Sequence, residues 1–152
     1  MSHSGHSSTR HGYVGGTIWV DHASQWIFHS PQHSLNAADT LRGKLLLERE
    51  AADVGATIRS IHTDNGVFNS TLFRDHCSAR LQKLRFSGVG AHHQNGVAEG
   101  AIRTISNMAR ANLIHASLRW PEQSLLDLWP FAMSYAVWVH NHLPPHGYGL
   151  CA

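Results

Sequence analysis

Two carboxylates stand where an α/β protein could carry out metal-dependent chemistry. Asp64 follows the alternating segment 56–62 and precedes Asn65-Gly66, where the chain must turn. In open α/β sheets, ligands bind in the crevice beyond the carboxyl ends of the strands. Glu99 lies in the first turn of a predicted helix, where the helix dipole favours a carboxylate. Both residues are therefore candidates for a functional site.

Carboxylates from distant elements make chemical sense together if they share a hard divalent cation. Magnesium takes oxygen ligands and usually binds through one or two carboxylates plus phosphate oxygens. A pair of such ions about 4 Å apart activates the attacking oxygen and stabilises the leaving oxygen in phosphodiester chemistry. Each residue also has a structural explanation, because Asp-Asn-Gly is common in turns and Glu is common in first helical turns. Spacing alone leaves both interpretations open.

Hydrophobic periodicity predicts the elements that would position these residues. Asn36 is the expected N-cap of the first helix, Gly55 its stop, and Pro31 the end of the second strand. The last helix is expected to be apolar almost all round. The order indicates a single α/β domain. Strands are predicted over 17–21, 25–30, 56–62 and 83–87, and helices over 36–54, 70–82, 97–116 and 124–140.

Composition limits the class of protein. The 152 residues are 42% hydrophobic and 14% charged, as expected of one globular domain. A formal net charge of +2 is too small to indicate nucleic acid by itself. No apolar run approaches the roughly 20 residues that span a bilayer, and residues 1–10 do not form a secretory signal. We expect an intracellular protein without a membrane partner.

Histidines and tryptophans allow further interpretations. The histidine groups, such as His92-His93, lack a convincing fourth ligand for zinc, so ordinary histidines are favoured. The tryptophans could stack on bases, but their positions in strands and an apolar helix favour core packing. They are Trp19, Trp26, Trp120, Trp129 and Trp138, of which Trp120, together with Pro121, is expected to shape the loop before the last helix.

Longer strings surround the two carboxylates. They are HTDNGVF at 62–68 and FSGVGAHHQNGVAE at 86–99, with VDHAS at 20–24 and NHLPP at 141–145. Together they resemble the catalytic core of copia-type LTR retrotransposon integrases, over about residues 15–145. That family belongs to the retroviral integrase superfamily. The resemblance implies an RNase H-like mixed sheet flanked by helices, and an Asp-Asp-Glu triad.

The resemblance also implies roles for single residues. Asp64 matches the second triad carboxylate and Glu99 the third, so both are expected to be catalytic and to bind Mg²⁺ or Mn²⁺. The expected DNA contacts are Gln94 and Asn95, in the loop near the cleaved bond, and Arg103 and Asn107, one and two helical turns beyond Glu99. The partners implied are the element ends and the target DNA.

The first triad aspartate has no clear match. Asp21 lies in a string that resembles the second strand of the family, where the Asp is not a metal ligand. The first Asp of the family lies on the preceding strand, and residues 1–13 contain no Asp or Glu. We therefore expect a chain truncated at its N-terminus that lacks the first strand, with Asp21 as a possible substitute. The expected division is a disordered leader over 1–13, a partial core over 14–146 and a tail over 147–152.

A second departure is Gly100, because the family usually places Arg directly after the catalytic Glu. The expected function is a DNA-integrating polynucleotidyl transferase that is incomplete and inactive as this fragment, and nuclear if functional. One alternative is a catalytically dead remnant that binds nucleic acid weakly. Another is an interaction module whose last helix forms a subunit interface in a homo-oligomer.

Overall fold

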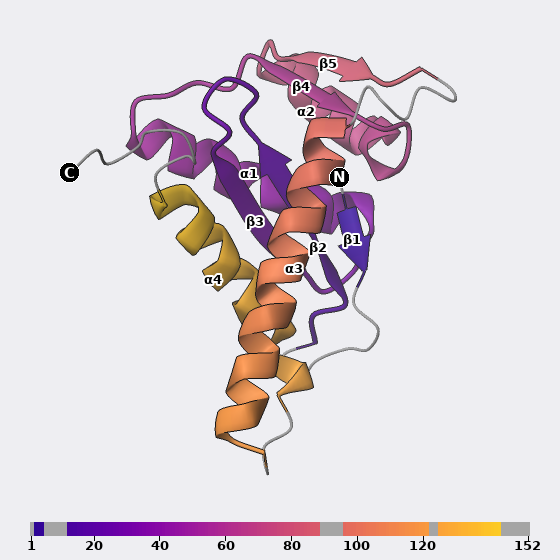
Figure 1. The fold of residues 1–152 in the computed structure, drawn as a ribbon. Coiled ribbons are helices and arrows are strands. Elements are labelled where there is room, and N and C mark those ends of the chain that lie inside the picture. Colours follow the sequence, from indigo (N-terminus) through magenta and orange to yellow (C-terminus); the bar gives the residue numbers. More distant parts are fainter. Residues whose placement is uncertain (1, 5–11, 89–95, 122–124, 144–152) are drawn as a thin grey trace, which may run out of the picture.

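Two small sheets carry the fold, as the ribbon in Figure 1 shows. The computed structural model describes residues 2–4, 12–88, 96–121 and 125–143. The first sheet is antiparallel with strand order β1-β2-β3, and the second is a parallel β4-β5 pair. The strands are β1 (Ser2–Ser4), β2 (Gly15–Val20), β3 (Ile27–Gln32), β4 (Ser60–Thr63) and β5 (Lys83–Phe86).

Helices lie on both faces of the antiparallel sheet (Figure 1). α3 and α4 lie side by side and contact β2 and β3, while α1 contacts β3 and also packs against α2. This mixed α/β arrangement confirms the predicted fold class. The helices are α1 (Ala37–Asp53), α2 (Thr71–Ala79), α3 (Gly96–Arg119) and α4 (Trp129–His142), with 3-10 turns η1 (Val67–Asn69) and η3 (Leu126–Leu128).

Alternation along β2 separates two hydrophobic cores. Ile18 is buried in the first core, whereas its neighbour Trp19 packs against the second, because successive strand residues face opposite sides of a sheet. The first core consists of Ile18, Ile27, Ile105, Ala109, Ala132, Met133, Ala136 and Val137. The second core consists of Ile61, Phe68, Phe73 and Cys77.

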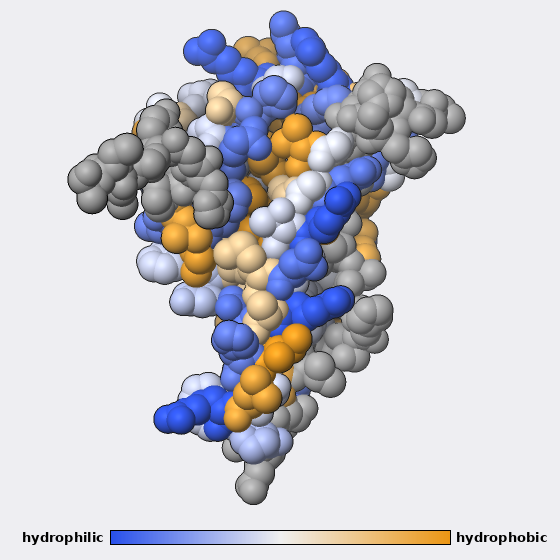
Figure 2. Space-filling model, in the orientation of Figure 1, coloured by the Kyte–Doolittle hydropathy of each residue, from blue (hydrophilic) through white to orange (hydrophobic). Residues whose placement is uncertain are grey.

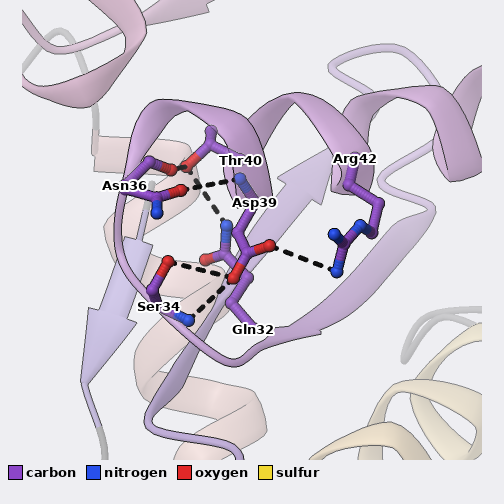
Figure 3. A network of polar contacts seen from close by, with 6 residues as sticks. All are labelled: Gln32, Ser34, Asn36, Asp39, Thr40 and Arg42. Atoms are coloured by element: carbon purple, nitrogen blue, oxygen red, sulfur yellow. Dashed lines mark hydrogen bonds and ion pairs between the residues drawn. The ribbon is translucent and has the colours of Figure 1, made fainter.

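The start of α1 is held by local polar contacts (Figure 3). The side chain of Asn36 accepts a hydrogen bond from the Asp39 amide at 2.9 Å, which confirms Asn36 as the N-cap. The Asp39 carboxylate in turn accepts from the amide and hydroxyl of Ser34 and pairs with Arg42 at 3.2 Å. At the other end Gly55 has φ +74°, a conformation that suits glycine and ends the helix.

A buried chain of neutral hydrogen bonds then ties α1 to the first sheet. Thr17 donates to Gln32 at 3.0 Å, and Gln32 donates to Thr40 at 3.1 Å. The Thr40 hydroxyl donates to the Asn36 carbonyl at 2.9 Å. These side chains are buried, so each hydrogen bond offsets the free-energy cost of removing its polar groups from water.

Several predicted boundaries were wrong. β3 continues through Pro31, which pairs with Gly16, because a proline is tolerated in an edge strand. β4 begins only at Ser60, α3 continues to Arg119, and α4 begins at Trp129 rather than near 124.

The N-terminal leader also differs from expectation. Ser2–Ser4 form β1 and pair with Gly15–Thr17 of β2, so these three residues are not disordered. In the ranges that the structure describes, no strand pairing joins β2 to β4. The division into a partial core over 14–146 and a tail over 147–152 stays a prediction. None of the described helices is long and apolar enough to cross a membrane.

The last helix is apolar on both sides, as the sequence predicted, but only one side is buried. Its inner side buries residues such as Met133 and Ala136, whereas Phe131, Tyr135 and Trp138 are about half exposed. Core packing was therefore the wrong prediction for Trp138. Trp120, which directly follows α3, is 57% exposed.

Candidate metal and nucleic-acid site

The carboxyl ends of β4 and β5 are tied together just where Asp64 leaves the sheet. Thr63 pairs with Phe86 in parallel register. The Ser87 amide then donates to the Thr63 carbonyl at 2.9 Å, and the Asn65 side chain donates to the Ser87 carbonyl at 3.3 Å. The structure thus places Asp64 at a strand end, as the sequence predicted.

The Asp64 side chain is half-buried and holds its own turn. Its Oδ1 accepts a hydrogen bond from the Gly66 amide at 3.2 Å, an Asx turn that leads into η1. A carboxylate carries about four lone-pair sites, so this bond leaves acceptor capacity for a cation.

Glu99 lies in the first turn of α3 and is half-buried. Figure 1 shows this end of α3 at the same end of the molecule as β4 and β5. Arg103 and Asn107 follow at one and two turns along the helix, and both are exposed. α3 therefore presents a carboxylate, a cation and an amide along one side.

The described residues do not form a metal site with three protein ligands. Gln94 and Asn95 lie outside the described residues. Within the described ranges, no group of three or more His, Cys, Asp or Glu side chains could hold a metal ion. Asp64 and Glu99 provide oxygen ligands of the type that magnesium prefers, from two different elements of the fold.

Asp21 takes part in the turn between β2 and β3. Its Oδ2 accepts hydrogen bonds from the Ser24 hydroxyl at 2.6 Å and the Ser24 amide at 2.8 Å. These bonds hold the pKa of Asp21 below its usual value. The turn also contains Gln25 at φ 60°, whose amide donates to the Asp21 carbonyl. These contacts give Asp21 a structural role.

Gly100 is not required by packing. A Cβ atom placed there would meet nothing within 4 Å. The helix could therefore accommodate the arginine that the resembled family carries next to its glutamate.

Sequence reasoning missed a buried ionic cluster between α1 and α2. The ammonium of Lys44, fully buried, contacts the Glu48 carboxylate and lies 3.0 Å from Nδ1 of His76. Gln82 donates to the same Glu48 oxygen at 2.7 Å. The i,i+4 spacing of Lys44 and Glu48 is visible in the sequence, but it usually marks an exposed helix face.

Burial and the Lys44 ammonium lower the pKa of His76. Burial alone would raise the pKa of Glu48, but hydrogen bonds from Lys44 and Gln82 outweigh it and lower that pKa. Because an ammonium can only donate, His76 Nδ1 must accept from it, which requires a neutral imidazole.

Comparison with known proteins identifies the fold. The sequence matches no protein-family profile and no curated protein. The HTLV-2 integrase catalytic core domain in complex with magnesium superposes in its trimeric form with a TM-score of 0.61 and 24% identity, over 86% of this chain and 75% of that one. The dimeric form of the same domain superposes with a TM-score of 0.63 and 22% identity, over 95% of this chain and 83% of that one. This is an integrase catalytic-core fold.

A third integrase structure agrees. The simian T-cell lymphotropic virus intasome in complex with the PP2A regulatory subunit B56 gamma gives a TM-score of 0.69 and 19% identity. The match covers 94% of this chain but 48% of that chain. The RNase H-like class predicted from the sequence is thus confirmed. At these identities the likeness establishes the fold, and function has to be argued from the residues.

Proposed function

We propose that this chain is the catalytic-core portion of a copia-type LTR retrotransposon integrase, a DNA-binding polynucleotidyl transferase. The observation that carries the proposal is the pair Asp64 and Glu99, each within its integrase-like string, on an integrase catalytic-core fold. Asp64 follows a strand and Glu99 opens a helix, so both stand where an RNase H-like enzyme can present carboxylates to a phosphodiester.

Asp64 and Glu99 are the proposed ligands of Mg²⁺ or Mn²⁺. Two carboxylates suit one such ion, whose other ligands are water and phosphate oxygens. A metal held by these residues would supply Lewis-acid chemistry, favouring attack by a water or a DNA 3′-hydroxyl and departure of the leaving oxygen. The retroviral cores of the same fold were solved with magnesium.

DNA is the proposed substrate and partner, in the form of element ends and target DNA. Arg103 and Asn107 extend from Glu99 along an exposed side of α3 and can contact phosphates. Gln94 and Asn95 precede the same helix and are proposed to approach the cleaved bond. Such contacts would hold the scissile phosphate beside the two carboxylates.

A third carboxylate is needed to complete the triad, and the described part of the chain groups none with the other two. Asp21 is engaged by Ser24. We therefore expect this chain to bind a metal ion and DNA but to join DNA ends poorly or not at all. The same observation favours the second candidate, a catalytically dead remnant that binds nucleic acid weakly.

Assembly and location follow from the same proposal. The HTLV-2 cores are described as dimeric and trimeric forms, and we propose that this chain also forms homo-oligomers. Action on chromosomal DNA would place the working protein in the nucleus.

The test combines Mn²⁺ binding, followed by electron paramagnetic resonance, with joining of labelled DNA ends. Asp64→Asn and Glu99→Gln are each expected to weaken Mn²⁺ binding about tenfold or more, because each removes an anionic ligand. Asp75→Asn, which changes an exposed carboxylate of α2, is the matched control and should bind like the wild type.

Three outcomes separate the candidates. Mn²⁺ binding that neither variant changes would contradict the proposed site. Salt-sensitive DNA binding without specific Mn²⁺ binding would support the remnant. Robust end joining that Asp64→Asn and Asp21→Asn both abolish would show a complete triad, with Asp21 as its first member.

A further inference from the structure

The parallel pair β4–β5 has one face in the second core and one face in solvent. Ile61 is buried in that core, and Leu84 and Phe86 pack against it. Because successive residues of a strand point to opposite faces, the alternate residues lie on the outer face of the pair. These residues are Ser60, His62, Lys83 and Arg85, and all four are exposed.

The strand register brings basic side chains together on this outer face. Ser60 lies beside Lys83, and His62 lies beside Arg85. Two residues beyond Arg85, the Ser87 hydroxyl lies 3.2 Å from Nε2 of His62, so these side chains share a face across the two strands. Lys83 and Arg85 are two residues apart, which separates their positions by about 7 Å along the strand.

No acidic residue offsets the positive charge of these two strands and their flanks. Segments 59–63 and 80–88 contain Arg59, Arg80, Lys83 and Arg85 but no Asp or Glu. The ion pairs found within the described ranges join other residues, all of them in α1. In Figure 2, hydrophilic residues dominate the surface at the end of the molecule that β4 and β5 form in Figure 1. Such a surface attracts a polyanion.

The outer face leads to the candidate metal ligands. Both strands run in the same direction, so the path from Lys83 to Arg85 continues toward the strand ends, where Asp64 follows β4. The hydrogen bond from the Asn65 side chain to the Ser87 carbonyl ties the two strand ends together. A polyanion lying along this face would therefore reach Asp64.

The side chains of the outer face suit phosphates rather than bases. The Arg85 guanidinium can bind a phosphate in a bidentate manner, and the Lys83 ammonium supplies a compact positive charge. None of the four outer residues is Phe, Tyr or Trp, and Phe86 packs against the core, so no such ring is presented for base stacking. Phosphate contacts of this kind position DNA without reading its sequence.

We propose that the outer face of β4–β5 binds the phosphate backbone of duplex DNA through Lys83 and Arg85 and directs that DNA to Asp64. The inference rests on the proposed function, and it adds a second surface to the DNA contacts proposed for α3 and the residues before it. An acidic protein segment would also match the charge. Continuity with a carboxylate proposed to act on phosphodiesters favours DNA.

The test is the salt dependence of DNA binding, measured by fluorescence anisotropy with duplexes of two unrelated sequences between about 50 and 200 mM KCl. Lys83→Gln and Arg85→Gln should each reduce the slope of log K against log salt concentration by about 1. Each should also weaken binding about five- to tenfold near 0.1 M salt, equally for both sequences. The double variant should lose about 2 from the slope.

The matched control is Arg119→Gln, which removes an exposed cation from the last residue of α3. Figure 1 places that end of α3 opposite the end formed by β4 and β5. The control should keep the slope of the wild type, and thermal unfolding establishes that every variant is folded. An equal loss of slope in Arg119→Gln would show a general effect of charge and would overturn the proposal.

Unchanged slopes in both single variants and in the double variant would also overturn it. If DNA binding is unchanged but both single variants lose binding to a labelled polyglutamate peptide, the face is a protein site and the proposal is wrong. Mn²⁺ binding should match the wild type in Lys83→Gln and Arg85→Gln, because neither residue is a proposed metal ligand. Intact Mn²⁺ binding with unchanged slopes would reject this face alone. Reduced slopes in a chain without specific Mn²⁺ binding would support the face and reject the metal site.

Discussion

The two cores lie on opposite sides of β2 but are stabilised by different interactions. The first core is built from aliphatic side chains and alanines where α3 and α4 cross the sheet. The second core is aromatic and lies against a fully buried ammonium, that of Lys44, which is 5.9 Å from the Phe73 ring centroid. The stability of the first should depend on packed volume, and that of the second on charge compensation.

The difference also concerns how each core joins the sheet. The first core rests directly on the β2–β3 ladder. The second reaches β2 through aromatic contacts, with Trp19 edge-on to Phe68 at 5.8 Å and stacked on Phe73 at 6.4 Å. The two parts of the fold are thus linked by side chains where the described strands do not pair.

The largest expected effect comes from removing the buried cation. Lys44→Met should lower the free energy of unfolding by about 3–5 kcal/mol, because it leaves the Glu48 carboxylate, whose side chain is 13% exposed, without its partner. Urea denaturation measures the change. The double variant Lys44→Met, Glu48→Leu should recover most of the lost free energy of unfolding, because it no longer buries an unpaired carboxylate. Arg42→Met, which removes a side chain that is 66% exposed from its ion pair with Asp39, should cost less than about 1 kcal/mol. Equal losses in the two single variants would remove the distinction between the cores.

A smaller effect is expected from adding volume to the first core. Ala136 is fully buried on the inner side of α4, so Ala136→Leu should lower the free energy of unfolding by about 1–3 kcal/mol through overpacking. The matched control is Ala111→Leu, the same change at an exposed position of α3. A neutral Ala136→Leu would show that the first core contains unfilled space.

The smallest effect is a dependence on pH that belongs to the second core. The pKa of His76 is lowered from 6.5 in the folded protein, so the unfolded chain binds the proton more readily. The contribution of neutral His76 to the free energy of unfolding is therefore complete above about pH 6.5. It decreases as the pH falls through 6.5 toward the lowered pKa. The charged groups that act on His76 are Lys44, Glu48 and Arg80.

The measurement compares free energies of unfolding at pH 7.5 and 5.5. His76→Gln should lose less stability than the wild type over this interval, since glutamine can still accept from Lys44 but does not titrate. Ala136→Leu should keep the pH dependence of the wild type. The contribution of Glu48 falls in a separate window, below about pH 4.5, because its pKa is lowered from that value. Identical pH profiles for His76→Gln and wild type would argue against the neutral His76–Lys44 contact.

Features that depend on neighbouring residues were predictable from the sequence. The N-cap at Asn36, the stop at Gly55 and the position of Asp64 after a strand all follow from local hydrogen bonding and backbone preference. The strings around Asp64 and Glu99 led to the RNase H-like fold, which the structural comparisons confirm.

Tertiary structure decided the features that depend on what lies opposite a residue. Pro31 fits inside β3 only because that strand is an edge. Lys44 and Glu48 have the spacing of an exposed pair, yet Lys44 is buried because α2 covers it and His76 accepts its hydrogen bond. Trp138 has the composition of a core residue but faces outward, because the inner side of α4 is filled by smaller side chains. Burial is set by non-local packing, which local pattern and propensity do not encode.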